Sequence, residues 1–474
     1  MSDDTVQSGV VRVTQLVDEQ RIGRFLISIM VLGFLCQIGD GYDLAAAAYA
    51  AVGIARDWHI ERSLLAPVFS ASLVGMMFGA PLFGFVGDRF GRRAAIIVCS
   101  TMCGLFSLAT AGAHSLLALA VLRFFTGIGL GGLPTNTIAL MAEYAPARAR
   151  AVLITLMFMG ITLGGTVPAV VAALVPNVTW HLLFLVGGVL PIVAALLNFA
   201  FLPESMKFLA LRDPRHPQLI TLARRMRPEL SLPDKASFII ATRNAQRFAV
   251  RMLFEGKLRW ITPLIWMLFI TNLMSNFFLN SWMPTLLHAS GLSPAQAAIA
   301  ASMYYFGGVV GGLAIAVALD RGMLGIVGVF MLLACPAVAW LGTPGFSPVM
   351  LKLSVFLVGV TVLGNQLGLN SVVGLSYPTA IRANGTGWAL GVGRVGAILG
   401  PLVGGQLIHA QLPLRLLFLA PIAPLAIGAV AALILRPLAR DRFARVEPAQ
   451  AAEERAAAED VHADDAHAAR AKSA

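Results

Sequence analysis

Twelve long apolar stretches constrain the fold of this chain more than any other feature. Each is close to the ~20 residues that a helix needs to cross the ~30 Å hydrocarbon layer of a bilayer. Charged residues make up 12% of the 474 residues, about half of the ~25% that is usual in soluble proteins. The sequence therefore predicts an all-α integral membrane protein with twelve transmembrane helices. The stretches cover residues 25–51, 64–86, 94–113, 116–141, 152–175, 181–203, 260–287, 295–319, 324–342, 349–376, 385–409 and 414–435.

The positions of the Lys and Arg residues predict which side of the membrane each loop faces. With residues 1–24 placed in the cytoplasm, 29 of the 35 basic residues lie on cytoplasmic segments and 4 lie on the outside. Cytoplasmic loops of membrane proteins carry an excess of Lys and Arg. We therefore expect both termini in the cytoplasm and the chain in the inner (plasma) membrane. The net charge of +11 then reflects topology and not nucleic-acid binding.

The twelve stretches divide into two sets of six, and short markers recur between the sets. The pair Asp88-Arg89 recurs as Asp-Arg 232 residues later, at 320–321, and Arg150 recurs 232 residues later as Arg382. We call this separation the repeat offset. A duplicated six-helix unit is the plan of many secondary transporters, which bind substrate between the halves near the membrane midplane. We therefore expect two pseudo-symmetric six-helix bundles. The expected segments are a cytoplasmic N-terminal segment 1–24, a bundle 25–203, a basic cytoplasmic connector 204–259, a bundle 260–435 and a cytoplasmic tail 436–474.

The loop after the second stretch carries a long motif, and shorter motifs follow elsewhere. The loop reads Gly84-x-x-x-Asp88-Arg89-x-Gly91-Arg92-Arg93. The shorter motifs are Asp40-Gly41-Tyr42-Asp43, Pro203-Glu204-Ser205, Tyr377-Pro378-Thr379 with Arg382 and Gly385, and Gly393-Arg394-x-Gly396 with Gly400-Pro401. The loop resembles the signature of the major facilitator superfamily, and the shorter motifs resemble its aromatic acid:proton symporter family. The resemblance implies the major facilitator fold and symport of an aromatic carboxylate with protons. The chain departs from the family pattern in the second copy of the loop, which is reduced to Asp320-Arg321-Gly322.

Two carboxylates in the first stretch are candidates for proton coupling. Asp40 and Asp43 are three residues apart, so they share one face of a helix. Burial and mutual repulsion both disfavour two charges at this place, so at least one of them should be able to take up a proton. The alternative is a structural pair held by a basic partner. The spacing does not decide which Asp carries the proton, and we favour Asp43 because it lies nearer the outside.

Two arginines within the stretches are candidates for substrate binding. A charge at the bilayer centre costs roughly 2.5–3.5 kcal/mol even on lenient scales, so each needs an anion. Arg123 could pair with Asp40, with Asp43 or with the substrate carboxylate, and a static ion pair between helices is the alternative. Arg394 lies between Gly393 and Gly396, and its planar fork can bind a carboxylate through two hydrogen bonds. We favour Arg394 as the substrate anchor over a static pair.

Amides and aromatic rings are candidates for the rest of the substrate site. Asn272 and Asn276 are four residues apart in the seventh stretch, so both should face the protein interior or a watery cavity. They could bind a ring hydroxyl or simply hold helices together. Flat aromatic walls suit an aromatic substrate, and Trp282, Tyr304 and Trp388 are candidates for them. Each of the three could equally face lipid or the protein core.

The family resemblance also implies a charge network that closes the cytoplasmic side. The candidate gating residues are Asp88, Arg89, Arg92, Glu143 and Arg150. Ion pairs at a membrane edge can form and break without deep burial. The alternative is a solvated basic loop that only sets the topology.

These expectations describe a proton-coupled symporter that imports aromatic carboxylates such as benzoate, hydroxybenzoate or protocatechuate by alternating access. The alternatives are a transporter of another small organic anion, such as a sialic acid or a dicarboxylate, and a membrane sensor that binds such acids without moving them. We expect no enzyme activity, cofactor or metal, because the sequence has no Gly-x-x-x-x-Gly-Lys phosphate loop and its histidines are scattered. The expected partners are an aromatic carboxylate, protons and the bilayer, with no nucleic acid, and we expect a monomer.

Overall fold

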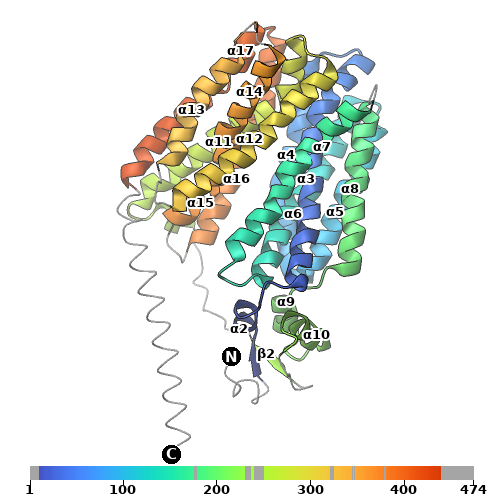
Figure 1. The fold of residues 1–474 in the computed structure, drawn as a ribbon, viewed down its shortest axis with the longest axis vertical. Helices are drawn as coiled ribbons and strands as arrows, with labels where there is room; N and C mark the ends of the chain where they lie inside the picture. The colour runs from blue at the N-terminus through green and yellow to red at the C-terminus, as the bar shows by residue number, and fades with distance from the viewer. Residues whose placement is uncertain are drawn as a thin grey trace, which may run out of the picture.

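The computed structural model describes residues 10–175, 179–229, 236–239, 250–320, 325–343, 345, 347–377 and 381–438. Within these residues, eleven helices are long and apolar enough to cross a membrane. Figure 1 shows the helices as two groups, one in blue to green and one in yellow to red. The first group contains α3 (Arg24–Asp57), α4 (Ala66–Phe90), α5 (Arg92–Ala111), α6 (Leu116–Tyr144), α7 (Arg150–Leu174) and α8 (Trp180–Phe201).

The second group contains one short and one interrupted helix. The short helix is α13, whose 16 residues are fewer than a straight crossing needs. The interrupted helix contains a π-helical turn, η3, which joins α14 to α15. The elements of this group are α11 (Leu258–Ala289), α12 (Pro294–Asp320), α13 (Ile326–Leu341), α14 (Pro348–Val358), η3 (Gly359–Leu363), α15 (Gly364–Ser376), α16 (Arg382–His409) and α17 (Leu414–Leu419), which begins the span Leu414–Leu438.

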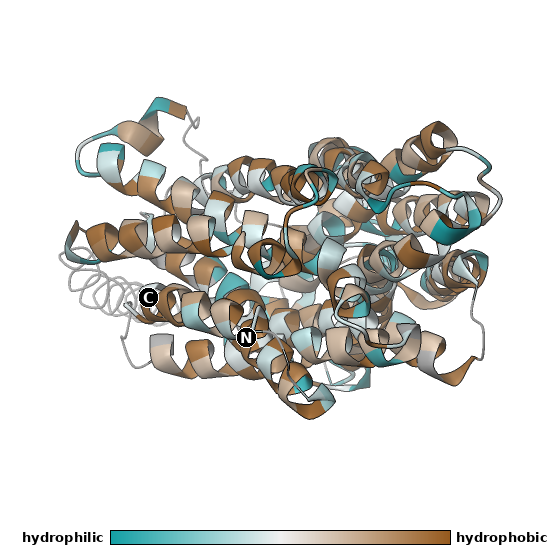
Figure 2. Cartoon of the chain, turned by 90° about the horizontal axis from the view of Figure 1, so that it is seen from above, coloured by the Kyte–Doolittle hydropathy of each residue, from teal (hydrophilic) through white to brown (hydrophobic). Residues whose placement is uncertain are grey.

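The outer surface of the helices is strongly apolar, as the lipid environment requires. Large hydrophobic side chains are exposed on many helices, including Leu117, Phe201 and Val349. Figure 2 shows brown, hydrophobic residues along the helices, with the teal, hydrophilic residues gathered mainly at loops and helix ends. A water-soluble monomer rarely exposes apolar patches of this extent. The predicted all-α membrane fold is therefore confirmed, with eleven long spans and one short one.

The packing of the helices repeats with the same repeat offset that the sequence markers suggested. A Cβ atom at Gly164 of α7 would lie 2.1 Å from the carbonyl oxygen of Ile38. At the equivalent positions of the second bundle, a Cβ atom at Gly396 of α16 would lie 2.0 Å from the carbonyl oxygen of Ile270. Only glycine allows two helix backbones to approach so closely. The two bundles are therefore built on the same helix–helix contacts.

The repeat also includes the contact between α4 and α6 and its counterpart in the second bundle. A Cβ atom at Gly79 of α4 would lie 2.0 Å from the carbonyl oxygen of Ile128, and one at Gly311 of α12 would lie 2.1 Å from that of Val360. Both members of this pair are again related by the repeat offset. The offset also holds beyond the π turn, because Gly396, the equivalent of Gly164, lies after Leu363.

Short elements cluster at the lower end of the first bundle in Figure 1. The sequence predicted no strand, but Val10–Arg12 (β1) pairs in parallel with Ser237–Ile239 (β2). This pairing joins the N-terminal segment to the connector between the bundles. The other short elements are α2 (Val13–Asp18), α9 (Met206–Arg212), α10 (Pro217–Met226), η2 (Val250–Phe254) and, at the opposite end, η1 (Arg62–Leu65).

Candidate functional site

A buried ion pair joins α3 to α6 inside the first bundle. The Nη1 atom of Arg123 lies 2.7 Å from both carboxylate oxygens of Asp43, and the two side chains are 2% and 1% exposed. The Nη2 atom of Arg123 also donates to the backbone oxygen of Asp43 at 3.4 Å. The guanidinium lies over the ring of Phe184, 5.8 Å from its centre, a cation–π arrangement. Of the partners considered for Arg123, the structure therefore brings Asp43 to it.

The second carboxylate, Asp40, has no such partner. Its side chain is buried, and its Oδ1 atom accepts no hydrogen bond from the residues that the structure describes. The cation that acts on it is Arg394, which belongs to the other bundle. No ion pair within 4.0 Å joins the two among the described residues. Asp40 is thus a buried acid within electrostatic range of a positive charge on the other bundle.

Tight packing of α16 on α11 holds Arg394 at this interface. A Cβ atom at Gly393 would lie 2.8 Å from Cβ of Phe269, and Gly396 lies against the backbone of Ile270. These glycines bring the backbone of α16 close to α11 on either side of Arg394. The Arg394 side chain is only partly buried, so its donors can reach a ligand between the bundles.

An amide network surrounds the middle of α11. The Nδ2 atom of Asn272 donates to Oε1 of Gln366 at 2.9 Å, and Nδ2 of Asn365 donates to Oδ1 of Asn272 at 3.3 Å. The hydroxyl of Tyr304 donates to Oδ1 of Asn276 at 2.9 Å. The structure therefore brings Asn272, Asn276 and Tyr304 to one region, and their role in substrate binding stays a prediction.

Asn365 and Gln366 are members of this network that the sequence analysis missed. They form a polar dipeptide in the middle of the apolar stretch 349–376. Polar residues inside membrane helices usually face the protein interior, so this dipeptide was the signal that could have identified them. The Oδ1 atom of Asn365 is buried and has no hydrogen-bond partner among the described residues.

A small cavity lies where α11 and α12 meet α3 of the first bundle. It has room for about one water molecule and is lined by Tyr304 and the neighbouring Tyr305 together with Tyr49 of α3. The Tyr305 hydroxyl donates to Asn280 at 2.5 Å. The cavity is therefore walled by aromatic rings from both bundles, with an amide within reach.

The other two predicted aromatic wall residues lie elsewhere. Trp282 is fully buried, donates from Nε1 to the backbone oxygen of Pro401 at 3.0 Å, and packs edge-on against Phe69 at 5.2 Å. Trp388 is 41% exposed and stacks on Trp266 at 6.1 Å. Six residues separate Trp388 from Arg394, which places them about 120° apart around the helix. Neither tryptophan is among the residues that line the cavity beside Tyr304.

The bundles contact each other toward the upper end of Figure 1. The Tyr49 hydroxyl donates to Ala298 O at 3.4 Å, and the Ser70 hydroxyl donates to Ile398 O at 2.9 Å. At the loops beyond them, Nδ1 of His409 lies 3.1 Å from Glu61. Trp282, packed on Phe69, belongs to the same set of contacts. The structure therefore shows closure at the end opposite α2, α9 and α10.

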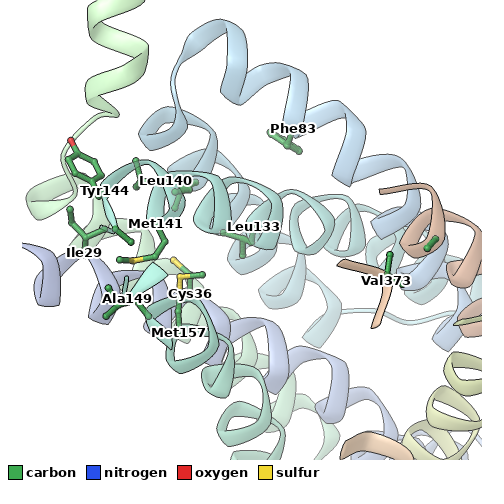
Figure 3. Close-up of a cluster of buried hydrophobic side chains, with 14 of the residues drawn as sticks. Ile29, Cys36, Phe83, Leu133, Leu140, Met141, Tyr144, Ala149, Met157 and Val373 are labelled. Atoms are coloured by element: carbon green, nitrogen blue, oxygen red, sulfur yellow. The ribbon is translucent and has the colours of Figure 1, made fainter. Parts of the chain in front are cut away.

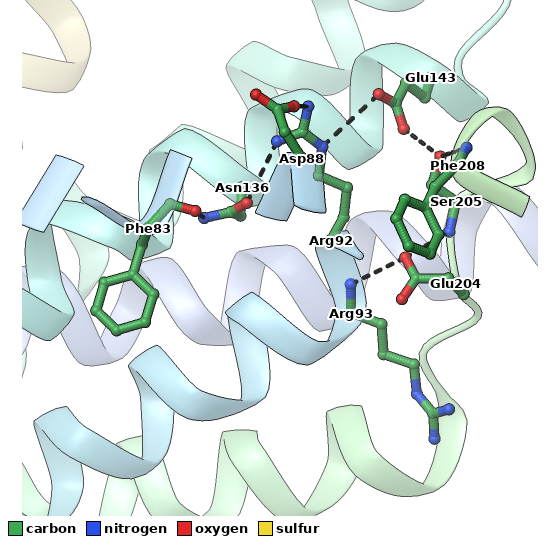
Figure 4. Close-up of polar contacts among 9 residues, drawn as sticks. All are labelled: Phe83, Asp88, Arg92, Arg93, Asn136, Glu143, Glu204, Ser205 and Phe208. Carbon is green, nitrogen blue, oxygen red and sulfur yellow. Dashed lines mark hydrogen bonds and ion pairs between the residues drawn. The ribbon is translucent and has the colours of Figure 1, made fainter. Parts of the chain in front are cut away.

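The predicted gating residues gather around Arg92 at the lower end of the first bundle, as Figure 4 shows. Arg92 pairs with Asp88, and its Nε atom lies 3.7 Å from Oε1 of Glu143. Its Nη1 atom donates to Asn136 at 3.5 Å. Glu143 also accepts a hydrogen bond from Ser205. The network thus links α4, α5, α6 and the segment before α9.

Two predicted gating residues lie outside this network. Arg150 lies 3.9 Å from Asp18 of the N-terminal segment and donates to the backbone oxygen of Ala145. Arg89 lies over the ring of its neighbour Phe90. In the second bundle, residues 321–324 and the side chains of 320 and 382 lie outside the described part of the chain.

Glu204 is a further acid in this region, and the sequence analysis quoted it only as part of a motif. Its Oε1 atom accepts hydrogen bonds from the backbone nitrogens of Arg93 at 3.2 Å and of Ser205 at 2.8 Å. Burial raises the pKa of the Glu204 carboxyl, and these backbone hydrogen bonds oppose that rise. The carboxyl therefore holds the start of α5 against the segment after α8.

Comparison with known proteins decides the family. The family model described as Major Facilitator Superfamily matches residues 33–395 and 265–468. The chain belongs to the major facilitator superfamily. This transporter is 34% identical over 426 residues to the 4-hydroxybenzoate transporter PcaK of Pseudomonas putida, a match that covers 89% of this chain and 95% of the relative. It is 34% identical over 405 residues to the gallate transporter of P. putida (85% and 90%) and 30% identical over 433 residues to the benzoate transport protein of Acinetobacter baylyi (90% and 92%).

Solved structures agree with this fold. The partially occluded inward-open xylose transporter XylE of Escherichia coli matches this transporter with a TM-score of 0.68 at 16% identity, covering 88% of this chain and 98% of that one. The nucleoside transporter NupG matches with a TM-score of 0.66 at 17% identity, covering 87% and 100%. The chain is thus a multi-pass membrane transporter and not an enzyme.

Proposed function

We propose that this protein imports an aromatic carboxylate together with a proton across the inner (plasma) membrane. The observation that carries the proposal is the buried Asp40 of the first bundle, whose Oδ1 atom accepts no hydrogen bond from the described residues and which lies within electrostatic range of Arg394 of the second. One group can take up a proton and the other can bind a carboxylate. The relatives support the substrate class, because they are named as transporters of 4-hydroxybenzoate, gallate and benzoate.

The pair explains why substrate and proton travel together. When the substrate carboxylate binds Arg394, it neutralises the charge that stabilises ionised Asp40. A buried carboxylate without its counter-charge costs several kcal/mol, so Asp40 then takes up a proton. Thermodynamic linkage makes the effect reciprocal, since protonated Asp40 leaves Arg394 free for the substrate. The empty transporter returns with Asp40 ionised and balanced by Arg394.

This assignment places the proton on Asp40 and gives Asp43 a different role. Asp43 already has a cation at 2.7 Å from each of its oxygens, so protonating it would leave Arg123 buried without an anion. We therefore assign the Asp43–Arg123 pair to positioning α3 against α6. Asp40, one helical turn away, replaces Asp43 as the preferred proton carrier.

The substrate ring is assigned to the space beside α11. Tyr304 and its neighbours supply aromatic walls, and Asn272 and Asn276 supply amides that can bind a ring hydroxyl. Trp282 is assigned to the contact between the bundles, because it is buried against Phe69. The Arg92 network is assigned to the cytoplasmic gate, with both chain termini in the cytoplasm as the distribution of basic residues predicts.

Uptake into proteoliposomes tests the proposal directly. Labelled 4-hydroxybenzoate, benzoate and gallate should accumulate above equilibrium under an inward proton gradient, and a protonophore should abolish the accumulation. Xylose serves as the control substrate, since the match to the xylose transporter shows only the fold. Accumulation that ignores the proton gradient would refute the coupling, and the absence of any counterflow with the three acids would refute the transport of aromatic carboxylates.

A further inference from the structure

Three buried polar side chains lie inside the first bundle, on the cytoplasmic side of Asp40. Gln37 precedes Asp40 by three residues on α3, so the two share a helix face about 4.5 Å apart along the axis. Thr137 of α6 and Asn198 of α8 complete the group, and all three side chains are at most 3% exposed. The apolar side chains of Met141, Met157 and Leu140, labelled in Figure 3, line the same cavity as Thr137 and Asn198.

The group has fewer hydrogen-bond partners than it needs. Gln37 donates from Nε2 to the Thr137 hydroxyl at 3.2 Å, and Asn198 donates from Nδ2 to the backbone oxygen of Ala194 at 2.6 Å. The Oε1 atom of Gln37 and the Oδ1 atom of Asn198 are buried and find no donor in the described residues. Buried carbonyl oxygens without a donor are rare in folded proteins. We therefore expect both oxygens to accept hydrogen bonds from a bound ligand.

A cavity adjoins Asn198 and Thr137, the residue to which Gln37 donates. Thr137 and Asn198 line it together with Gly33, Met141 and Met157, and it has room for about one water molecule. Water is the ligand that fits, because it is small and can donate to the Asn198 oxygen while it bonds to the Thr137 hydroxyl. The second bundle shows that the fold does not require polar groups here, because the repeat offset places buried Phe269 at the position equivalent to Gln37.

We propose that Gln37, Thr137 and Asn198 bind internal water that carries the proton of Asp40 toward the cytoplasm. The inference rests on the proposed role of Asp40. Because Asp40 stays buried even though the bundles contact each other at the opposite end, its proton needs a route through the first bundle.

The proton is conserved at each step. The O–H bond of Asp40 breaks, its electron pair stays on the carboxylate oxygen, and the proton joins a neighbouring water as hydronium. The Thr137 hydroxyl can accept one proton and donate another, whereas the two amides only orient water and stay neutral. One proton taken up from outside is thus released inside, and Asp40 is left ionised opposite Arg394.

Hydroxyl-radical footprinting tests the water site without any mutation. X-ray radiolysis of a bound water generates hydroxyl radicals that oxidise an adjacent methionine to its sulfoxide. Met141 and Met157 are both 1% exposed and line the cavity, whereas Met331 is equally buried and lines neither of the two cavities described for the molecule. In the intact transporter, Met141 and Met157 should be oxidised while Met331 stays unoxidised. Equal protection of all three would overturn the water site.

A matched pair of variants tests the proton route. Thr137→Val removes the hydroxyl at the cavity, and Thr271→Val removes one with the same bonds to its own helix, because each hydroxyl donates to the carbonyl four residues earlier at 2.8 Å. Proton-driven uptake of labelled 4-hydroxybenzoate should fall by about fivefold in Thr137→Val, the effect of losing one net hydrogen bond. Counterflow, which needs no net proton release, should stay normal in both variants.

Asn198→Leu provides a second variant should Thr137→Val fail to fold. Normal proton-driven uptake in a folded Thr137→Val or Asn198→Leu protein would overturn the proposed route. That outcome differs from failure of the proposed function, which shows itself as uptake in the unmodified protein that ignores the proton gradient.

Discussion

The two bundles share their helix packing but differ in the charges that they carry. Ile38 and Ile270 occupy equivalent places, each with its carbonyl oxygen against a glycine of the other helix. Two residues further along each helix, the first bundle has Asp40 and the second has Asn272. The same place in the fold thus holds an acid in one bundle and a neutral amide in the other. This difference agrees with the proposed function, in which the first bundle takes up the proton and the second binds the substrate carboxylate.

The Asp43–Arg123 ion pair of the first bundle likewise corresponds to uncharged residues in the second bundle. Asp43 and Arg123 correspond, at the repeat offset, to Ser275 and Val355. Both of the latter are fully buried, and Ser275 donates to the backbone oxygen of Pro421 at 3.2 Å. The second bundle therefore packs at this place without a charge. The ion pair of the first bundle is an addition to the shared architecture and not a requirement of it.

The largest effect is expected from breaking the ion pair on one side only. Asp43→Ser leaves Arg123 buried without an anion, which costs about 3–5 kcal/mol, so thermal unfolding of the purified protein should shift sharply downward. Asp43→Ser combined with Arg123→Val copies the second bundle and should recover most of the stability. If the double variant is less stable than the single variant, the correspondence between the bundles is wrong at this place.

The next largest effect tests whether Asp40 carries the proton. Asp40→Asn fixes the carrier in a neutral state, so accumulation of 4-hydroxybenzoate under a proton gradient should vanish while counterflow persists. Asp57→Asn, at the far end of the same helix, is the matched control and should accumulate substrate normally. Uphill uptake by Asp40→Asn at normal expression would remove Asp40 from the coupling and with it the contrast with Asn272.

A smaller effect is expected at the anchor of the second bundle. Arg394→Lys keeps the charge but loses the planar fork, so binding of 4-hydroxybenzoate should weaken by about 1–3 kcal/mol, the scale of a charge-assisted hydrogen bond. Arg415→Lys, at an exposed position at the start of α17, is the control. Binding should be measured by calorimetry on the purified protein. Unchanged affinity in Arg394→Lys would assign Arg394 to helix packing.

The smallest effect concerns how the protein recognises a hydroxyl on the substrate ring. Tyr304→Phe removes the hydroxyl that donates to Asn276 and frees that amide oxygen to accept from a ring hydroxyl. The ratio of 4-hydroxybenzoate to benzoate uptake should therefore change by about fivefold, which corresponds to ~1 kcal/mol for one net hydrogen bond. Phe306→Leu, which is exposed on the same helix, should leave the ratio unchanged. An unchanged ratio in Tyr304→Phe would place the ring away from Asn276.

The sequence by itself determined the membrane fold, the family and the short list of charges that matter. Hydropathy reveals the spans because a helix in lipid must be apolar over its whole length. Intramembrane charges such as Asp40, Asp43 and Arg394 stand out because they are costly and therefore rare. The repeat offset was also visible in the sequence, although only the helix contacts showed how far the repeat extends.

Only the tertiary structure decided which of these groups meet. The choice of Asp43 over Asp40 as the partner of Arg123 depends on how α3 and α6 are rotated against each other, and residue spacing within one helix carries no record of that rotation. Trp282 is placed against Phe69 by the meeting of two bundles, and Arg150 beside Asp18 by the packing of the N-terminal segment on the loop between α6 and α7. Contacts between segments far apart in the chain depend on the packing of whole helices, so no local pattern could have specified them.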